Sequence, residues 1–320
     1  MTILIHVVTF ACSIAIVWFF SGFLIESVGR MARRFNKTGF ITAYFVLGFL
    51  TSISEISVAI NSGIAGVPGV AVGNLIGASF VILLLIVPLL AVANKGISLT
   101  GSVSAPNLFL MLGLIVLPAV LVLDGNVTKT EGLLAVLAYA TVAFVLYRAR
   151  STTPPKVVEE RLDISGTFKD IGRILLSGLA IFLAAHFLVE QAVFMAMALS
   201  IPASLVGLVL LSLGTNLPEI VIAVRSVIHR RTDIAFGDYL GSSTMNTLVF
   251  GGVALASGTF LLESSEFIVT ALLMIAGLLC LYFFARSKCT LSRMEGIVLL
   301  LFYAAFIAIQ IANIAKFATD

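Results

Sequence analysis

Residues 211–219 read LSLGTNLPE and place one acidic side chain, Glu219, deep inside an otherwise apolar stretch. A related segment in the first half of the chain, residues 47–55, reads LGFLTSISE and ends on Glu55. Each segment is followed by a glycine-rich motif, GNLIGAS at 73–79 and GDYLGSS at 237–243. Both pairs of motifs are separated by the same 164 positions, so we interpret them as an internal repeat.

The composition of the whole chain is that of a membrane protein. Hydrophobic residues make up 60% and charged residues 11% of the 320 residues, and the mean hydropathy is +1.15. Globular chains carry about 25% charged residues. The net charge of +3 is too small for nucleic-acid binding, and the three scattered cysteines form neither a disulfide framework nor a metal-ligand pattern. We therefore expect an integral membrane protein that binds no nucleic acid, is not an enzyme and carries no cofactor.

Ten apolar stretches are each long enough to form a transmembrane helix, which needs about 20 residues. They fall at 3–28, 40–62, 69–92, 105–123, 130–147, 170–194, 202–228, 234–257, 266–285 and 294–314. A ten-span topology places 17 of the 19 Lys and Arg residues on one side, leaving Lys129 and Lys316 on the other. Because cations favour the cytoplasmic side, we expect both termini outside. The compact size and short loops favour a prokaryotic cell membrane.

The polar segment near mid-chain leaves five spans on each side, so the two halves enter the membrane in opposite senses, as in inverted-repeat transporters. The predicted fold class is an all-α polytopic membrane protein with ten transmembrane helices in two inverted five-helix repeats. The first repeat covers residues 1–150 and the second 167–320, joined by a cytoplasmic linker at 151–166.

The intramembrane carboxylates indicate the chemistry. An ionised carboxylate at the centre of a membrane helix costs at least about 2.5–3 kcal/mol, so it needs a cation, a proton or a polar partner. Thr51 and Thr215 precede Glu55 and Glu219 by one helical turn. Pro218 cannot donate a backbone hydrogen bond, so we expect the helix to break there and free carbonyl oxygens. Two carboxylates with hydroxyls and carbonyls reach the six to eight oxygens that suit Ca²⁺.

These residues resemble the calcium/cation antiporter superfamily, which includes the sodium/calcium exchangers. GTNLPE at 214–219 is similar to the family's G-T-S-L-P-E, and 237–246 is similar to its G-N-x-I-G-S-x-x-x-D/N. The resemblance implies a secondary antiporter that exchanges Ca²⁺ or a related cation for Na⁺ or H⁺ by alternating access. The cations would bind among spans 2, 3, 7 and 8, while spans 1 and 6 slide across them. By position, the implied ligands are Glu55, Glu219, Thr51, Ser52, Thr215, Asn216, Ser242 and Asn246.

The first repeat departs from the family pattern. Ser54 stands where the helix-breaking proline is expected, so we predict a weaker break there, with Ser54 bonding the Leu50 carbonyl. Ala78 replaces a serine, and Ile82 replaces an Asn or Asp. We infer fewer simultaneous ions and more weight for proton coupling. Two alternatives stay open: a proton/monovalent-cation exchanger on the same scaffold, or a transport-inactive membrane scaffold or sensor. The partners expected are inorganic cations and the lipid bilayer, and the oligomeric state stays open, with a monomer compatible.

Three further polar residues have more than one interpretation. Asp238 replaces a frequent Asn and is equally compatible with a ligand, a proton acceptor or a partner of Arg230 or Arg231. For Asn74 we expect an interhelical hydrogen-bond donor more than an ion ligand. For Glu26 we expect an ion pair with a nearby cation such as Arg30, one helical turn away.

Overall fold

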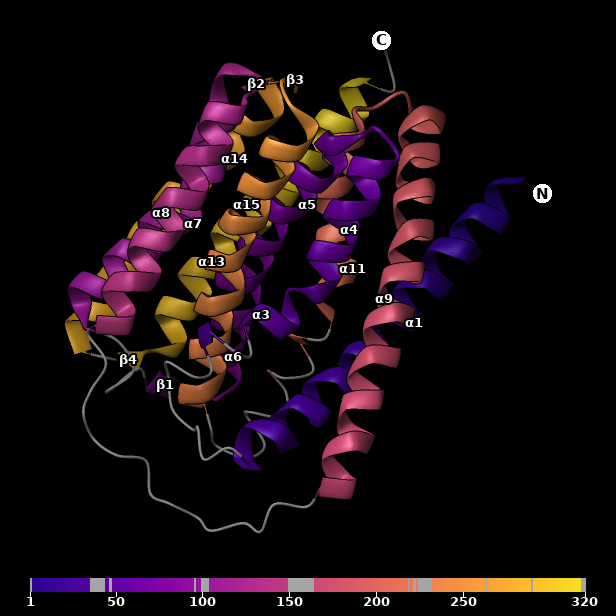
Figure 1. Ribbon diagram of the computed structural model, residues 1–320. Helices are drawn as coiled ribbons and strands as arrows, with labels where there is room; N and C mark the ends of the chain where they lie inside the picture. Colours follow the sequence, from indigo (N-terminus) through magenta and orange to yellow (C-terminus); the bar gives the residue numbers. More distant parts are fainter. Residues whose placement is uncertain are drawn as a thin grey trace.

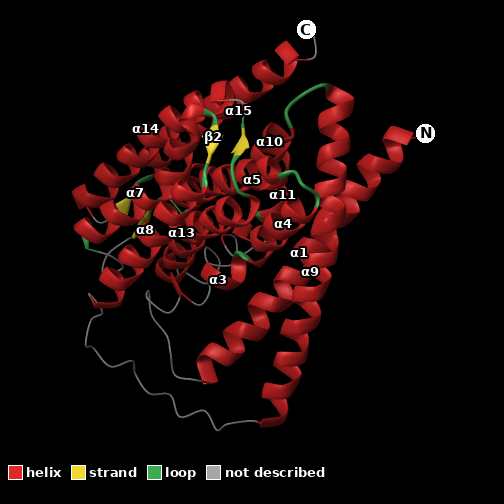
Figure 2. Cartoon of the chain, turned by 45° about the horizontal axis from the view of Figure 1, so that its top comes forward, coloured by secondary structure: helices red, strands yellow, loops and turns green. Residues whose placement is uncertain are grey.

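The computed structural model describes residues 2–34, 44–45, 48–94, 96–98, 104–148, 164–217, 219–220, 223, 232–262, 264–288 and 290–317. Helices make up nearly all of this part of the chain (Figures 1 and 2). The longer helices are α1 (Thr2–Arg34), α5 (Pro68–Val81), α7 (Ala105–Leu121), α8 (Lys129–Arg148), α9 (Ile164–Leu199), α13 (Thr232–Ser257), α14 (Ser264–Lys288) and α15 (Arg293–Phe317).

Shorter helical pieces complete the bundle. They are α3 (Gly48–Thr51), α4 (Ile53–Ile64), α6 (Val87–Ala93), α10 (Ala203–Val206) and α11 (Ser212–Thr215), with a 3-10 turn, η3 (Val122–Asp124). Two π-helical segments, η2 (Ile82–Ile86) and η4 (Gly207–Leu211), are continuous with the α-helices around them. A π-helical segment often marks a functional part of a helix.

The described helices account for the ten predicted spans. Seven are long and apolar enough to cross a membrane without interruption: Ile5–Leu24, Pro68–Ala93, Ala105–Asp124, Lys129–Arg148, Lys169–Leu199, Phe267–Arg286 and Arg293–Ala315. The other three predicted stretches correspond to α3 with α4, to α10 with η4 and α11, and to α13. The first two of these are interrupted helices. α13 is less apolar than the seven spans above because it is rich in buried polar residues.

The predicted linker at 151–166 lies outside the described residues except for its last three positions, which already belong to α9. Helix α9, the first of the second half, begins at Ile164.

Two small antiparallel sheets pair loops from opposite halves of the chain. β1 (Ile97–Ser98) pairs with β4 (Thr290–Leu291), and β2 (Asn126–Val127) pairs with β3 (Phe260–Leu261). Figure 1 shows the two sheets at opposite ends of the helical bundle. A ten-span topology puts the loops of β1 and β4 on one side and those of β2 and β3 on the other, so this pairing agrees with it.

The repeat extends to the helix ends. Thr128 and Glu131 form a reciprocal capping box at the start of α8, with the Thr128 N–H donating to Glu131 Oε2 at 2.7 Å. Ser292 and Glu295 form the same box at the start of α15, also at 2.7 Å. Each capping box satisfies backbone N–H groups that the helix itself leaves free. Both residues of the second box follow their counterparts by 164 positions, so the repeat reaches the last spans.

The centre of the bundle is the third span. Along Pro68–Ala93, 83% of the apolar window is buried, against 22% for Lys129–Arg148 on the outside. Exposed apolar side chains on the outer helices, such as Leu133, Leu137 and Phe144, are suited to contact with lipid chains. The third span is therefore enclosed by protein, which is where polar groups are tolerated inside a membrane.

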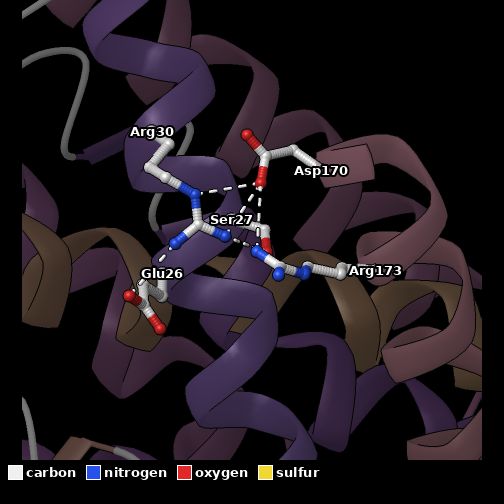
Figure 3. Close-up of polar contacts among 5 residues, drawn as sticks. All are labelled: Glu26, Ser27, Arg30, Asp170 and Arg173. Atoms are coloured by element: carbon white, nitrogen blue, oxygen red, sulfur yellow. Dashed lines mark hydrogen bonds and ion pairs between the residues drawn. The ribbon is translucent and has the colours of Figure 1, made fainter. Parts of the chain in front are cut away.

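Helices α1 and α9 lie against each other at one side of the bundle (Figures 1 and 2). Near one end of this pair, Arg30 Nε and Nη2 donate to Asp170 Oδ1 at 2.9 and 2.8 Å. Arg30 also forms the expected ion pair with Glu26, at 3.0 Å (Figure 3). Asp170 is buried, with 3% of its side chain exposed, while 59% of the Glu26 side chain is exposed. The two outer helices are thus joined by a buried carboxylate.

Candidate cation-binding site

Both spans that carry the glutamates are interrupted at equivalent positions. α3 ends at Thr51 and α4 begins at Ile53, so Ser52 separates them, with φ −75° and ψ 3°. In the second repeat α11 ends at Thr215, and Asn216 has φ −91° and ψ 9°. The first repeat is therefore interrupted although it lacks the proline. Pro218, on which the expected break in the second repeat was based, lies outside the described residues.

A side-chain hydrogen bond to a backbone carbonyl explains the interruption in both repeats. The Ser52 hydroxyl donates to the Gly48 carbonyl at 2.7 Å, while the Ser52 backbone N–H reaches the same oxygen only at 3.3 Å. The Asn216 amide donates to the Ser212 carbonyl at 2.6 Å. Such bonds compete with the helical backbone for its carbonyls. The bond made by the polar residue after each threonine is thus a feature that both interruptions share.

Ser54 does not act as predicted. Its hydroxyl donates to Glu55 Oε2 at 2.8 Å and lies 3.3 Å from the Thr51 carbonyl, not at the Leu50 carbonyl. Ser54 therefore supports the carboxylate directly.

The two glutamates are fully buried and lie close enough for their charges to interact. Both side chains have 0% exposure. The charges of Glu55 and of Asp238 both act on the Glu219 carboxylate, and Glu55 also interacts with the Thr215 hydroxyl of the other repeat. Among the described residues, Glu55 Oε1 and both carboxylate oxygens of Glu219 have no hydrogen-bond partner. Buried charges without partners are costly, so these oxygens need a cation or a proton.

The two threonines make equivalent contacts across the repeat. The Thr51 hydroxyl on α3 donates to Asp238 Oδ1 on α13 at 3.3 Å. The Thr215 hydroxyl on α11 donates to Asn74 Oδ1 on α5, also at 3.3 Å. Asn74 and Asp238 are themselves repeat counterparts, 164 positions apart. Asn74 thus makes an interhelical bond, but as an acceptor, so the donor role expected of it is wrong for this contact.

The remaining predicted site residues line the same region from α13. The Ser242 and Ser52 hydroxyls are 3.5 Å apart, and Ser242 has 0% exposure. The Asn246 amide donates to the Ser79 hydroxyl of α5 at 3.1 Å, and within the described chain Asn246 Oδ1 has no hydrogen-bond partner. All eight predicted residues are therefore buried, and these contacts join spans 2, 3, 7 and 8. Ile82, the counterpart of Asn246, is buried among apolar side chains.

Glycines let the helices of the two repeats approach closely at the site. A Cβ on Gly77 of α5 would overlap the Leu208 carbonyl of η4, and a Cβ on Gly241 of α13 would overlap the Tyr44 carbonyl. Tyr44 and Leu208 are repeat counterparts, as are the two glycines. The Gly-x-x-x-Gly pairs thus bring α5 and α13 against the interrupted spans, as small residues do in membrane helix packing.

Two polar residues outside the predicted ligand set, Asp238 of the eighth span and Ser79 of the third, also lie at the site. Asp238 has 1% exposure, and its Oδ2 has no partner among the described residues. Ser79 has 2% exposure and joins the Asn246 amide. Their position on the glycine-rich motifs, 164 residues from Asn74 and Ser243, was the available signal.

The oxygens gathered here suit a cation held by a few carboxylates and many neutral oxygens. No three His, Cys, Asp or Glu side chains of the described chain come together in the manner of a preformed metal centre. Hard cations such as Ca²⁺ and Na⁺ accept hydroxyl, amide and carbonyl oxygens beside carboxylates. The donors gathered here are thus the oxygen types that hard cations accept.

A known protein family matches both halves of the chain. A family model described as "Sodium/calcium exchanger protein" matches residues 5–148 and 169–312. The sodium/calcium exchanger MaX1 of Methanosarcina acetivorans is 37% identical over 154 residues, which cover 47% of this chain and 43% of that relative. An uncharacterised membrane protein of Methanocaldococcus jannaschii is 25% identical over 302 residues, covering 93% of this chain and 96% of that protein.

The fold is shared with a solved structure. The sodium-calcium exchanger NCX_Mj, soaked with Na⁺ and Sr²⁺, superposes with a TM-score of 0.67 at 22% identity, over 95% of this chain and 97% of that one. This likeness confirms the predicted fold of ten spans in two inverted repeats.

Proposed function

This chain belongs to the sodium/calcium exchanger protein family, and we propose that it exchanges Ca²⁺ for Na⁺ at the buried site between its two repeats. The family expected from the motifs is confirmed, and the chain is a secondary-active cation antiporter of the membrane. The identity of the ions and the residues that bind them belong to the proposal.

One observation carries the proposal: two buried glutamates, one from each repeat, with three carboxylate oxygens that lack partners among the described residues. Their two negative charges match one Ca²⁺ or two Na⁺. Because the same oxygens serve either ion, only one kind can be bound at a time. Such competition at a single site is sufficient for exchange when the site opens to each side in turn.

The neutral ligands in this proposal are Thr51, Ser52, Thr215, Asn216, Ser242 and Asn246. Each is buried and belongs to the contacts that join the four central spans. The cations are cargo, so the protein needs no resident cofactor and performs no bond chemistry. We place the protein in a prokaryotic cell membrane with both termini outside, since this orientation puts most of its cations on the cytoplasmic side.

The second candidate is a proton/monovalent-cation exchanger. It is favoured by Ile82, which cannot coordinate a cation at the position where the second repeat has Asn246. Flux measurements distinguish the two candidates. Purified protein is reconstituted into Na⁺-loaded vesicles and diluted into Na⁺-free choline medium that contains ⁴⁵Ca²⁺. We expect ⁴⁵Ca²⁺ uptake that a Na⁺ ionophore abolishes. Uptake driven only by a pH gradient would support the second candidate.

Variants at the glutamates test the site itself. Glu55→Gln and Glu219→Gln keep the side-chain shape and remove one charge each, so we expect the loss of Na⁺-driven uptake. Glu26→Gln is the matched control, because Glu26 is exposed near the end of α1. Thermal unfolding in detergent shows whether each variant is folded. A folded Glu219→Gln protein with normal uptake would contradict the proposed site.

A further inference from the structure

A proline inside α7 leaves one backbone carbonyl of that helix without its usual donor. Pro118 has no N–H, so it cannot donate to the Leu114 carbonyl four residues earlier, as another residue of an α-helix would. Both residues are buried, and an unpaired carbonyl is costly when it is removed from water. The Leu114 carbonyl therefore needs a donor from outside the regular helical pattern.

Thr247 of α13 supplies this donor. Its hydroxyl donates to the Leu114 carbonyl at 2.9 Å, and its side chain is buried. Proline is tolerated inside membrane helices because neighbouring helices and Ser or Thr hydroxyls satisfy the backbone groups that it frees. A side-chain hydrogen bond thus fixes α13 against α7 at this level of the bundle.

The residue before Thr247 fixes α13 on another side. The Asn246 amide donates to the Ser79 hydroxyl of α5 at 3.1 Å, and its Oδ1 has no hydrogen-bond partner in the described part of the chain. Consecutive residues of an α-helix point about 100° apart. The two bonds therefore hold α13 from two directions, and a rotation of α13 about its axis would turn Asn246 Oδ1 away from the cation site.

The mirror-related positions of the other repeat lack this arrangement. The counterparts of the two α13 residues are Ile82 and Leu83, both buried among apolar side chains. The counterpart of Pro118 is Tyr282, which has a backbone N–H of its own. The proline, the hydroxyl and the candidate ligand thus occur together beside α13 and are replaced together beside α5.

We propose that Thr247 is a positioning residue for Asn246. Its bond to the carbonyl that Pro118 frees sets the rotation of α13, and with it the direction of the Asn246 side-chain oxygen in the cation site. This proposal rests on the proposed exchange function, in which Asn246 is a ligand. Because Thr247 acts through its neighbour, loss of its hydroxyl weakens ion binding and leaves the turnover of the loaded protein nearly unchanged.

Uptake of ⁴⁵Ca²⁺ into Na⁺-loaded vesicles tests this role. Thr247→Val keeps the shape of the side chain and removes the hydroxyl. We expect the Ca²⁺ concentration at half-maximal uptake to rise about three- to tenfold, the range of one neutral hydrogen bond, with the maximal rate within about twofold of the wild type. Thr247→Ser keeps the hydroxyl and should restore the wild-type concentration. Thr141→Val is the matched control, since the Thr141 hydroxyl bonds the Leu137 carbonyl of its own helix on an exposed face of α8.

A double variant separates positioning from mere support of α7. Pro118→Ala/Thr247→Val gives the Leu114 carbonyl a backbone donor again, so α7 no longer needs the threonine. Against Pro118→Ala alone, we expect equal thermal unfolding in detergent but the same raised Ca²⁺ concentration at half-maximal uptake. This comparison stands even if Thr247→Val alone does not fold. Equal half-maximal concentrations for the two proteins would show that Thr247 only satisfies a carbonyl, which overturns the positioning role.

Two further results would overturn the proposal and leave the exchange function in force. One is a folded Thr247→Val protein that reaches half-maximal uptake at the wild-type Ca²⁺ concentration. The other is an Asn246→Leu protein with an unchanged half-maximal concentration, because Asn246 would then not be a ligand. A folded wild type without any Na⁺-driven uptake would instead refute the exchange function itself.

Discussion

Ser79 contacts its own counterpart, Ser243: the Ser79 hydroxyl on α5 lies 3.5 Å from the Ser243 carbonyl on α13, and the two residues are 164 positions apart. A residue can meet its own equivalent only near the axis that relates the two repeats, as in symmetric dimers. The pseudo-two-fold axis therefore passes between α5 and α13 at this level. Because Asn246 also bonds Ser79, the axis runs through the polar region that holds the predicted ligands.

The side-chain bond that interrupts the seventh span leads to a prediction at Asn216. Asn216→Ala removes the amide that takes the Ser212 carbonyl at 2.6 Å, so the turn at Asn216 loses its side-chain support and Glu219 can shift. We expect Na⁺-driven ⁴⁵Ca²⁺ uptake to fall by tenfold or more, roughly the effect of losing one hydrogen bond of about 1.5 kcal/mol.

Asn216→Ser is the control for this prediction. Serine stands at the equivalent position 52, where its hydroxyl bonds the carbonyl four residues earlier. This variant should keep the rate of uptake within about threefold of the wild type, which corresponds to a rise of less than about 0.7 kcal/mol in activation free energy. Equal activity of the alanine and serine variants would show that the bond does not control the site.

The close approach of helices gives a prediction at Gly77. Gly77→Ala places a methyl group against the Leu208 carbonyl of η4, where no space exists. We expect a loss of about 1–3 kcal/mol in stability from overpacking, measured by thermal unfolding in detergent, with loss of uptake.

Gly113→Ala is the matched control within α7. A Cβ on Gly113 meets no atom within 4 Å, so alanine there should leave stability equal or raise it by up to about 1 kcal/mol. If both alanine variants unfolded at the same temperature, the packing of α5 against η4 would not depend on Gly77.

Much of the architecture follows from the sequence because the repeat has a constant offset. Once Thr51 and Thr215 were aligned, the same offset paired Gly77 with Gly241 and Glu55 with Glu219. Inverted halves must then meet face to face, which predicts the burial of both glutamates without knowledge of any helix angle. The strand pairs between loops of opposite halves agree with that arrangement.

The details of the site depend on geometry that a sequence does not contain. The missing N–H of Pro218 is visible in the sequence, whereas the bond from the Ser52 hydroxyl to the Gly48 carbonyl depends on a side-chain rotamer. The contact of Asp238 with Thr51 depends on how α13 crosses α3. The sequence alone is therefore compatible with Asp238 as a ligand, a proton acceptor or the partner of an arginine.

The buried ion pair between the two outer helices supports a last prediction. Asp170 accepts two bonds from Arg30 and lies 3.8 Å from Arg173 of its own helix (Figure 3). Asp170→Asn removes the charge that these two cations share, and one quarter of the Arg30 side chain is exposed, so solvent compensates part of the loss. We expect a loss of about 1–3 kcal/mol in stability, below the full cost of breaking a buried pair.

Glu26 provides the comparison within the same cluster. Its ion pair with Arg30 is as short as 3.0 Å, but 59% of its side chain is exposed, so Glu26→Gln should change stability by less than about 0.5 kcal/mol. Thermal unfolding of both variants in detergent measures the difference. High salt should reduce the small effect at Glu26 more than the effect at Asp170, because exposed charges are screened and buried ones much less so. Equal shifts for both variants, with equal salt dependence, would mean that Asp170 belongs to a solvated surface cluster and does not join α1 to α9.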